Sequence, residues 1–237
     1  MLDQVLGIYV LIDDILKIIG HKEDTRTQMS DAEVLTTALV STYFFGGNHA
    51  SAMSYLYSEG HIPDMLSASR FNRRLHRNWD LLFSIFYLLA DLFKHSNQSA
   101  SYLVDSFPVA VCHNIRISRS KILTGKQFRG KCDSKRTYFY WFKVFLITTQ
   151  EGLPVEMTFV PGSRAEIKGL EALPLNLPKG SQLYGDSGFT NYQIEDIAQE
   201  IDQIQLNICR IKNSKRGDIY PISLHKIQQR KYIESTF

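Results

Sequence analysis

A change of pattern at residues 96–99 constrains the fold of this chain more than any other sequence feature. Before this polar stretch, Ser-Asn-Gln-Ser, apolar residues recur at helical spacing. After it, β-branched and aromatic residues gather in short runs separated by turn residues. We therefore predict an all-helical region, residues 1–95, followed by a strand-containing domain, residues 96–237.

Five helices are expected in the first region. The predicted segments are 2–19, 30–45, 49–58, one that starts at Ser67 or Ser69, and 79–94. Ser30 and Glu33 have the spacing of a capping box, which predicts the start of the second helix. The first twenty residues are apolar, but Asp3, Asp13, Asp14 and Lys17 interrupt them, so a buried helix is expected and neither a membrane span nor a signal peptide.

The second region predicts an α/β domain with a mixed sheet flanked by helices. Strand-like runs and helical patterns follow one another here, which is typical of this class. Strands are expected at 102–104, 109–112, 138–149, 155–160, 182–184 and 205–211, and helices at 165–173, 191–201 and from 224 onward. The aromatics of 138–145 are expected in the sheet core, and residues 113–136 are expected to form a long irregular connection.

Basic residues are concentrated in two segments. Eight Lys or Arg lie between His113 and Arg136 and seven between Arg210 and Lys231, although the whole chain carries a net charge of only +3. Two basic segments on an otherwise acidic protein suit a polyanion such as DNA. Two solvated loops explain the charge alone equally well. The three cysteines have no paired spacing, so neither a zinc site nor a disulfide framework is indicated.

Three acidic residues stand out as candidates for catalysis. Asp105 interrupts an apolar strand, Asp186 follows a short strand in Gly-Asp-Ser-Gly, and Glu234 lies on the last helical stretch. If they converge, their oxygens suit two hard cations such as Mg²⁺ or Mn²⁺, which can promote in-line displacement at phosphorus. Taken singly, a strand Asp is more often a cap or an ion-pair partner, and such a Glu is usually a surface residue.

An arginine stripe is expected on the fourth helix. Arg70, Arg73, Arg74 and Arg77 follow helical spacing, and a preceding short helix suits a helix-turn-helix reader of DNA. The alternative is a solvated arginine face near acidic neighbours. Ser163 with Glu166 is expected to be only a helix capping box.

The chain resembles the DDE transposases of bacterial insertion sequences, most closely the insertion sequence 982 family. The resemblance rests on Val-Asp105-Ser-Phe-Pro-Val, Pro161-Gly-Ser, Gly-Asp186-Ser-Gly-Phe, Arg230-x-x-x-Glu234 and the region around Arg70. It implies a ribonuclease-H-like fold, two Mg²⁺ or Mn²⁺ ions, and cutting and joining of DNA at transposon ends.

By position, the resemblance makes Asp105, Asp186 and Glu234 the metal-binding catalytic residues. It makes Arg230 a DNA contact, beside further candidates in the first basic segment: Arg116, Arg119, Lys126, Arg129 and Lys131. It also implies double-stranded DNA as partner, at least a dimer on DNA, and a cytoplasmic, nucleoid-associated protein without membrane contact.

Departures from the family pattern leave other functions open. Glu166 stands where relatives often have Asp, and Phe189 where they have Tyr. Relatives continue well past the glutamate, whereas this chain ends at Phe237, so a shortened C-terminus is expected. The alternatives are a metal-dependent nuclease with the same core and a non-catalytic, transposase-derived DNA-binding protein.

Overall fold

The computed structural model describes residues 1–113, 123, 125–132, 137–210 and 213–217. It divides into two compact units, residues 1–88 and 89–237, and the division falls inside helix α5 (Trp79–Ser96). The helix predicted from residue 224 onward lies outside the described residues.

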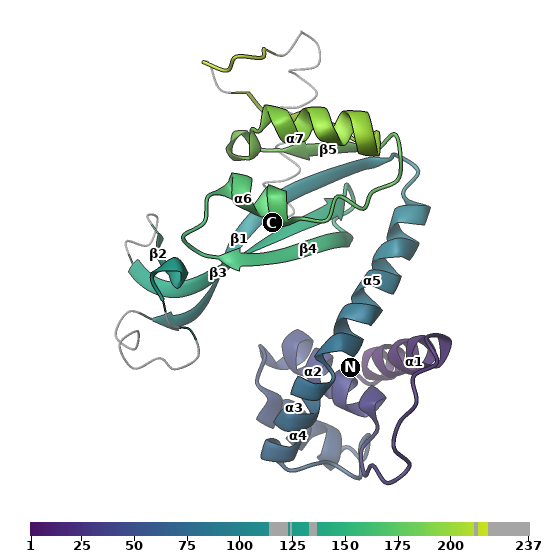
Figure 1. Cartoon of the computed structure of the whole chain (residues 1–237). Helices are drawn as coiled ribbons and strands as arrows, with labels where there is room; N and C mark the ends of the chain where they lie inside the picture. Colours follow the sequence, from purple (N-terminus) through teal and green to yellow (C-terminus); the bar gives the residue numbers. More distant parts are fainter. Residues whose placement is uncertain (114–122, 124, 133–136, 211–212, 218–237) are drawn as a thin grey trace. The chain divides into compact units, whose positions relative to one another are not determined.

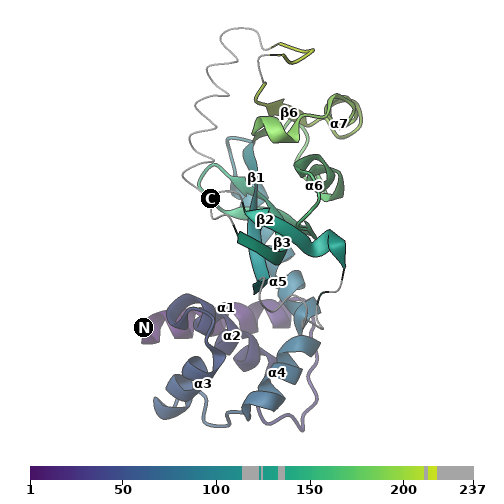
Figure 2. The same ribbon diagram turned by 90° about the vertical axis from the view of Figure 1, so that its left-hand side faces the viewer.

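The first unit is helical, as predicted. It contains α1 (Leu2–Ile18), α2 (Asp31–Phe45), α3 (His49–Ser58), α4 (Ala68–Arg77) and the start of α5 (Figure 2). The predicted capping box is confirmed: Ser30 accepts a hydrogen bond from the Glu33 N–H at 3.1 Å, and the Ser30 N–H donates to the Glu33 carboxylate at 2.6 Å. Gly46, with a φ of 57°, ends α2 in the left-handed conformation that glycine adopts without strain.

The core of this unit includes residues of α2, α3 and α4, and Val5 of α1 also belongs to it. Val34, Leu56 and Phe71 are fully buried and belong to one apolar cluster. Each lies on a different helix, so the cluster joins the three helices. Burying side chains of this size contributes roughly 1.5–3 kcal/mol each.

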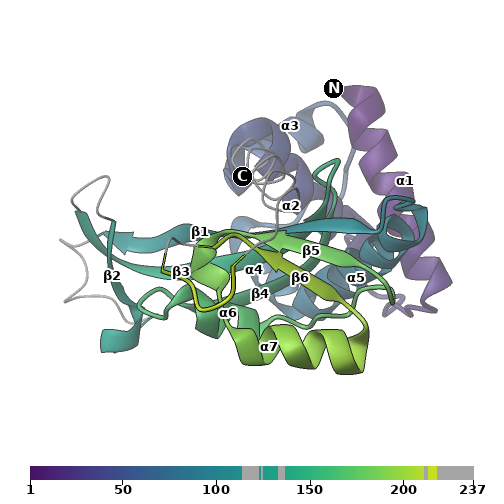
Figure 3. The same cartoon turned by 90° about the horizontal axis from the view of Figure 1, so that it is seen from above.

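The second unit is a mixed sheet flanked by helices, as predicted (Figure 1). Its strands are β1 (Ser101–His113), β2 (Arg129–Cys132), β3 (Thr137–Thr149), β4 (Pro154–Pro161), β5 (Gln182–Gly185) and β6 (Gln205–Ile208). The order is β2-β3-β1-β5-β6, and β4 also pairs with β3. β1 runs antiparallel to β3 and parallel to β5, and β5 runs parallel to β6 (Figure 3).

Helices follow the strands at the positions expected. α6 (Glu166–Ala172) packs against β3 and β4, and α7 (Tyr192–Ile197) continues as a π-helical turn, Ala198–Asp202, that contacts β6. Phe145 of β3 meets Phe189 edge to face with ring centroids 6.0 Å apart. The aromatics Tyr140, Trp141 and Phe145 of β3 are buried as predicted.

Two predictions for the strands are corrected. The runs 102–104 and 109–112 belong to one continuous strand, β1, which passes through Pro108. Proline is tolerated there because β5 pairs only with residues 101–104, so β1 has an open edge at Pro108 among the described residues. Residues 126–132, expected in an irregular connection, form the 3₁₀ turn η2 (Lys126–Phe128) and β2, which pairs with the start of β3.

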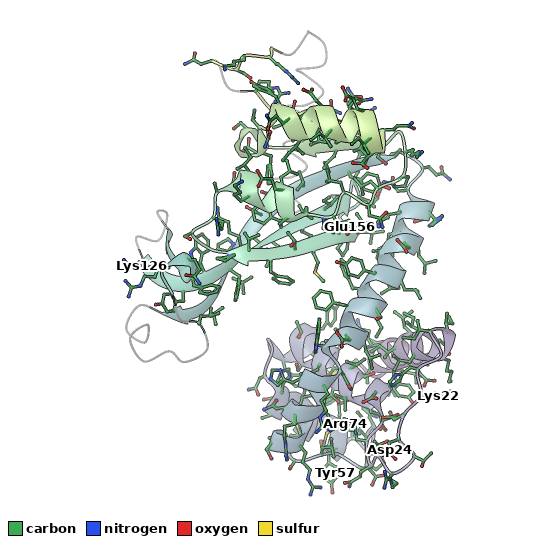
Figure 4. All side chains as sticks on the ribbon, viewed as in Figure 1. Lys22, Asp24, Tyr57, Arg74, Lys126 and Glu156 are labelled. Atoms are coloured by element: carbon green, nitrogen blue, oxygen red, sulfur yellow. The ribbon has the colours of Figure 1, made fainter. Side chains whose placement is uncertain are left out.

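A buried ion pair joins the end of α5 to β4. The ammonium of Lys94 donates to the Glu156 carboxylate at 2.6 Å, and both side chains are almost fully buried. Glu156 is labelled in Figure 4. Burial raises the pKa of Glu156, and the Lys94 charge and hydrogen bond oppose that rise. Separating the two side chains would leave an uncompensated buried charge, which is costly. The pair therefore holds the end of α5 against β4, a few residues before β1 begins.

The glycine of α6 gives a test of this packing. A Cβ on Gly169 would come within 2.1 Å of the Phe145 ring, whereas one on Gly7 of α1 would meet nothing within 4 Å. We expect Gly169→Ala to lower the free energy of unfolding by about 1–3 kcal/mol, through overpacking. The matched change Gly7→Ala should raise it by up to about 1 kcal/mol, through helix propensity. Urea unfolding followed by circular dichroism measures both, and a Gly169→Ala protein as stable as wild type would contradict this packing.

Candidate active site

Two aspartates are brought together by the parallel pairing of β1 and β5. The register runs from Ser101 opposite Gln182 to Val104 opposite Gly185. Asp105 and Asp186 are the next residues along these two strands. Neighbouring strands lie about 4.8 Å apart, so the register makes Asp105 and Asp186 neighbours although 80 residues separate them in the chain.

Both aspartates are held in the same local way. The Oδ1 atom of Asp105 accepts a hydrogen bond from the Ser106 N–H at 2.7 Å, and the Oδ1 atom of Asp186 accepts one from the Ser187 N–H, also at 2.7 Å. Asp186 thereby caps the short 3₁₀ turn η3 (Ser187–Phe189). Each side chain is half-buried. These contacts restrict the rotation of each carboxylate, that of Asp105 within β1 and that of Asp186 directly after β5.

Glu166 is a third carboxylate at this site, and the sequence pattern did not predict its position. It is the first residue of α6, and its Oε2 atom lies 1.7 Å from the place that a Cβ on Gly188 would occupy. Only glycine therefore fits at position 188 with Glu166 in this position. The only feature of the sequence that pointed to position 166 was the Asp that relatives often have there. It did not predict contact with the Gly-Asp186-Ser-Gly turn.

The electrostatics of Asp105 reflect this crowding. Burial raises the pKa of its carboxyl group most, the Ser106 N–H lowers it, and the charges of Glu166 and Asp186 raise it further; the net direction is upward. The negative charges of Glu166 and Asp186 repel a charge on Asp105, and a cation or a proton at Asp105 reduces this repulsion. The site is therefore suited to a positively charged ligand.

The carboxylates of the site are suitable ligands for a divalent metal ion, but the described residues do not provide a complete set of ligands. Carboxylate oxygens are the ligands that Mg²⁺ and Mn²⁺ prefer, and Asp105 and Asp186 supply them from adjacent strands. Among the described residues, no group of three Asp, Glu, His or Cys side chains is arranged to hold a metal ion. Glu234, the expected third ligand, lies outside the described residues.

The expected capping box at Ser163 is wrong. The residue that caps α6 is Ala165, which has no side-chain cap. The Ser163 hydroxyl donates instead to the Gln127 carbonyl at 2.7 Å, and the Ser163 N–H donates to the same carbonyl at 3.2 Å. The Ser163 hydroxyl is therefore bonded to Gln127, which is distant in sequence, and the Glu166 side chain lies against Gly188 instead of capping with Ser163.

The arginines of α4 divide into two kinds. Arg70, Arg73 and Arg77 line a surface hollow with Arg74 and Leu66. Arg74 is mostly buried and bonds Asp31 at 2.5 Å and Glu23 at 2.8 Å (Figure 4). Burial alone would raise the pKa of Asp31, but hydrogen bonds from Arg74, Asn78 and His21 lower it. Residues 59–67 join α3 to α4, which is longer than the three- or four-residue turn of a helix-turn-helix motif.

Of the remaining candidate DNA contacts, three lie among the described residues and three do not. Lys126 and Arg129 belong to η2 and β2, and Lys131 lies in β2. Arg116, Arg119 and Arg230 lie outside the described residues.

In the second basic segment, two arginines are already paired with acids. Arg210 bonds Glu195 at 2.7 and 2.5 Å, and Arg216 bonds Asp196 at 2.7 and 2.9 Å. The side chain of Tyr192 lies against both guanidinium groups, with its ring centroid 5.2 and 4.7 Å from them. These two charges hold the segment to α7 and contribute little free positive field.

The fold and the position of the two aspartates define the class of protein to which the chain belongs. A mixed sheet flanked by helices, with one aspartate inside β1 and another directly after the adjacent parallel strand β5, is consistent with the ribonuclease-H-like fold. The sequence model of the family described as "Transposase DDE domain" matches residues 95–237. This match covers more than half of the chain, so the protein belongs to the DDE transposase family.

The other comparisons add no relative. No curated protein and no solved structure matches the chain. The family match does not distinguish the insertion sequence 982 family, so that finer assignment stays a prediction. Within the residues that the structure describes, no helix is long and apolar enough to cross a membrane.

Removing one of the crowded charges should stabilise the metal-free protein. The pKa of Asp105 is raised in the folded protein, so the folded state holds its proton to higher pH than the unfolded state does. Wild type therefore loses stability as the pH rises from the ordinary pKa of an Asp to the raised one. In the presence of a chelator we expect Asp105→Asn to have a higher free energy of unfolding than wild type at pH 7, and a smaller advantage at pH 4. The exposed Asp202→Asn is the control. Urea unfolding at both pH values measures this, and an unchanged pH dependence in Asp105→Asn would overturn it.

Proposed function

We propose that this protein is an insertion-sequence transposase that cuts DNA at the ends of its element and joins the freed ends to target DNA. Membership of the DDE transposase family supports the general activity. The observation that carries the specific chemistry is the β1–β5 register, which makes Asp105 and Asp186 neighbours.

The carboxylates of Asp105 and Asp186 would hold the divalent ions that this family generally uses, Mg²⁺ or Mn²⁺. Glu234 is the third ligand by its position in the family motif. Two such ions, when bound, activate the attacking oxygen and stabilise the leaving oxygen at phosphorus. The contribution of the chain is to fix both aspartates through the Ser106 and Ser187 N–H groups, so that little reorganisation is needed.

Two successive reactions fit one such site. In the first, a water oxygen forms a bond to phosphorus while the bond to the 3′ oxygen breaks, which leaves a 3′-hydroxyl and a 5′-phosphate. In the second, that 3′-hydroxyl oxygen attacks a phosphodiester of the target, and the target's own 3′ oxygen leaves. Both are in-line substitutions, so one set of carboxylates serves both.

DNA recognition is assigned to the first unit. Arg70, Arg73 and Arg77 project from one helix into one hollow, and Arg74 is held by two carboxylates in the same unit. Clustered cations of this kind are stabilised when phosphates neutralise them. We expect at least a dimer on DNA, because both ends of an element must be joined.

Loss of either aspartate should stop cleavage without preventing binding. We expect Asp105→Asn and Asp186→Asn to lower metal-dependent cleavage of a DNA duplex carrying the element's end at least about a hundredfold, as expected for loss of a preorganised electrostatic group. Gel-based cleavage and strand-transfer assays with Mn²⁺ measure this, and Asp202→Asn should cleave normally.

Each assay outcome selects a function. Normal cleavage by either active-site variant refutes the assigned chemistry. Cleavage by wild type without strand transfer indicates a nuclease. Binding by wild type without cleavage indicates a non-catalytic DNA-binding protein.

The arginines of α4 give a separate prediction. The triple change Arg70→Ala, Arg73→Ala and Arg77→Ala should weaken DNA binding and reduce the slope of log affinity against log salt by about 0.9 for each phosphate that is no longer neutralised. Arg74→Ala should instead lower the unfolding temperature, because it leaves Asp31 and Glu23 without their shared cation. Fluorescence anisotropy over a salt series and thermal melts separate the two effects. An unchanged salt slope in the triple variant would count against a role in DNA binding.

A further inference from the structure

Glu166 differs from other glutamates of the same unit because its carboxylate has no partner. Among the residues that the structure describes, it forms no hydrogen bond and no ion pair. By contrast, Glu171, later on α6, bonds Lys168 at 2.6 Å, and Glu195 on α7 bonds Arg210. Glu166 is nevertheless only partly exposed. Its charge has therefore lost part of its hydration without gaining a protein partner, which is unfavourable.

The start of α6 does not explain the position of this side chain. The helix has no side-chain cap at Ala165, and the Ser163 hydroxyl, which could have paired with Glu166, is bonded to the Gln127 carbonyl. An acidic residue in the first turn of a helix gains a little from the helix dipole. A fully exposed glutamate would gain as much, so the dipole does not account for the place of Glu166 beside other carboxylates.

The turn after β5 leaves room for Glu166 beside the aspartates. The Glu166 Oε2 atom lies against Gly188, which belongs to the 3₁₀ turn that Asp186 caps. Of the two neighbouring charges that raise the pKa of Asp105, that of Glu166 acts more strongly than that of Asp186. Glu166 therefore lies against the turn that carries one aspartate and within electrostatic reach of the other.

This arrangement suits a cation that keeps part of its water. Mg²⁺ gives up water reluctantly, and proteins commonly bind it through only one or two carboxylates. Asp105 and Asp186 can supply these direct contacts. In the described part of the chain, no three acidic side chains are placed to ligate one ion. A third carboxylate can still accept hydrogen bonds from the water around the ion, and it adds negative charge to the site.

We propose that Glu166 is a further residue of the metal site, which binds the water around a divalent cation held by Asp105 and Asp186 and so raises the affinity of the DNA-free protein for that cation. Glu166 is a positioning residue in this arrangement, since it acts on the ion through water. The inference rests on the proposed function and deepens it, because it adds to the site a residue outside the set of Asp105, Asp186 and Glu234.

The decisive measurement is the affinity of the whole chain for Mn²⁺ alone, without DNA. Electron paramagnetic resonance follows the signal of free Mn²⁺ during a titration at pH 7. We expect Glu166→Gln to weaken binding at least about tenfold, the usual cost of losing a group that contacts a metal's ligands and not the metal itself. Glu166→Asp keeps the charge and should bind more tightly than Glu166→Gln.

Three results of this titration would overturn the proposal. The first is wild type that binds no Mn²⁺, and the second is Glu166→Gln that binds Mn²⁺ as tightly as wild type does. The third is Glu166→Asp that binds more weakly than Glu166→Gln, because the negative charge would then not be the feature that matters.

The matched control is Glu171→Gln, on the same helix. It removes the same charge from an exposed position that is already paired with Lys168. The Mn²⁺ affinity should stay within about twofold of wild type, because exposed charges are largely screened. A loss as large as that in Glu166→Gln contradicts the proposal, since the effect would then come from the net charge of the protein.

Thermal melts in EDTA separate this role from a structural one. If Glu166 only stabilised the start of α6, Glu166→Gln would lower the melting temperature without metal. The proposed role predicts a melting temperature in EDTA equal to or above that of wild type, because a repelling charge is removed. It also predicts a smaller rise when Mn²⁺ is added, since weaker binding stabilises less. A lower value in EDTA with an unchanged rise refutes the role.

Gly188 gives an independent test, because a Cβ there displaces the Glu166 carboxylate without a change of charge. The Cβ would fall 1.7 Å from Glu166 Oε2 but 3.7 Å from its Cβ, so Glu166→Ala leaves room for it. We expect Gly188→Ala to weaken Mn²⁺ binding in wild type and to add little in Glu166→Ala. Equal losses in both backgrounds speak against Glu166. Circular dichroism checks folding, and Glu166→Gln carries the test if Gly188→Ala does not fold.

Failure of this inference and failure of the proposed function are distinguishable. If Asp105→Asn loses Mn²⁺ binding while Glu166→Gln keeps it, the metal site stands and only the role of Glu166 is refuted. If Glu166→Gln binds Mn²⁺ more weakly while wild type cleaves no DNA, the role of Glu166 stands and the cleavage chemistry is refuted.

Discussion

The parallel pairing of β1 with β5 is the constraint on which the candidate site depends. Four residues of each strand are in register, and each strand delivers its aspartate directly after the last pair. A shift of one residue would turn one aspartate to the opposite face of the sheet. Apolar packing opposes such a shift: Leu103 and Tyr184 are buried together, and a Cβ on Gly185 would come within 2.8 Å of Val104. The position of the acidic pair is therefore a consequence of core packing.

The basic residues acquire different roles according to their partners. Arg74, Arg210 and Arg216 are each paired with carboxylates and hold segments of the chain together. Arg70, Arg73 and Arg77 share a hollow on α4. Counts of charge along a sequence treat all of these alike. The distribution of acidic partners in space separates the residues that stabilise the fold from those available to a nucleic acid.

Much of the secondary structure could be predicted because its signals are local. The Ser30–Glu33 cap and the apolar run of β3 depend on neighbours a few residues away, and both predictions are confirmed. The strand β2 could not be predicted because its residues are basic and polar; pairing with β3 and the packing of Gly130 against Trp141 hold it. The prediction for Ser163 was wrong for the same reason: its partner, Gln127, lies 36 residues away. Arg74 likewise finds Asp31, 43 residues distant, on another helix.

Pro108 has a consequence for how this protein behaves toward copies of itself. β1 continues nine residues past its last pair with β5, and within the described residues that edge has no further strand. An open edge invites strand addition from another chain, which leads to aggregation. A residue without an N–H interrupts the row of donors that an incoming strand would need. The edge beside Asp105 can thus stay open to a substrate while being a poor template for β-sheet growth.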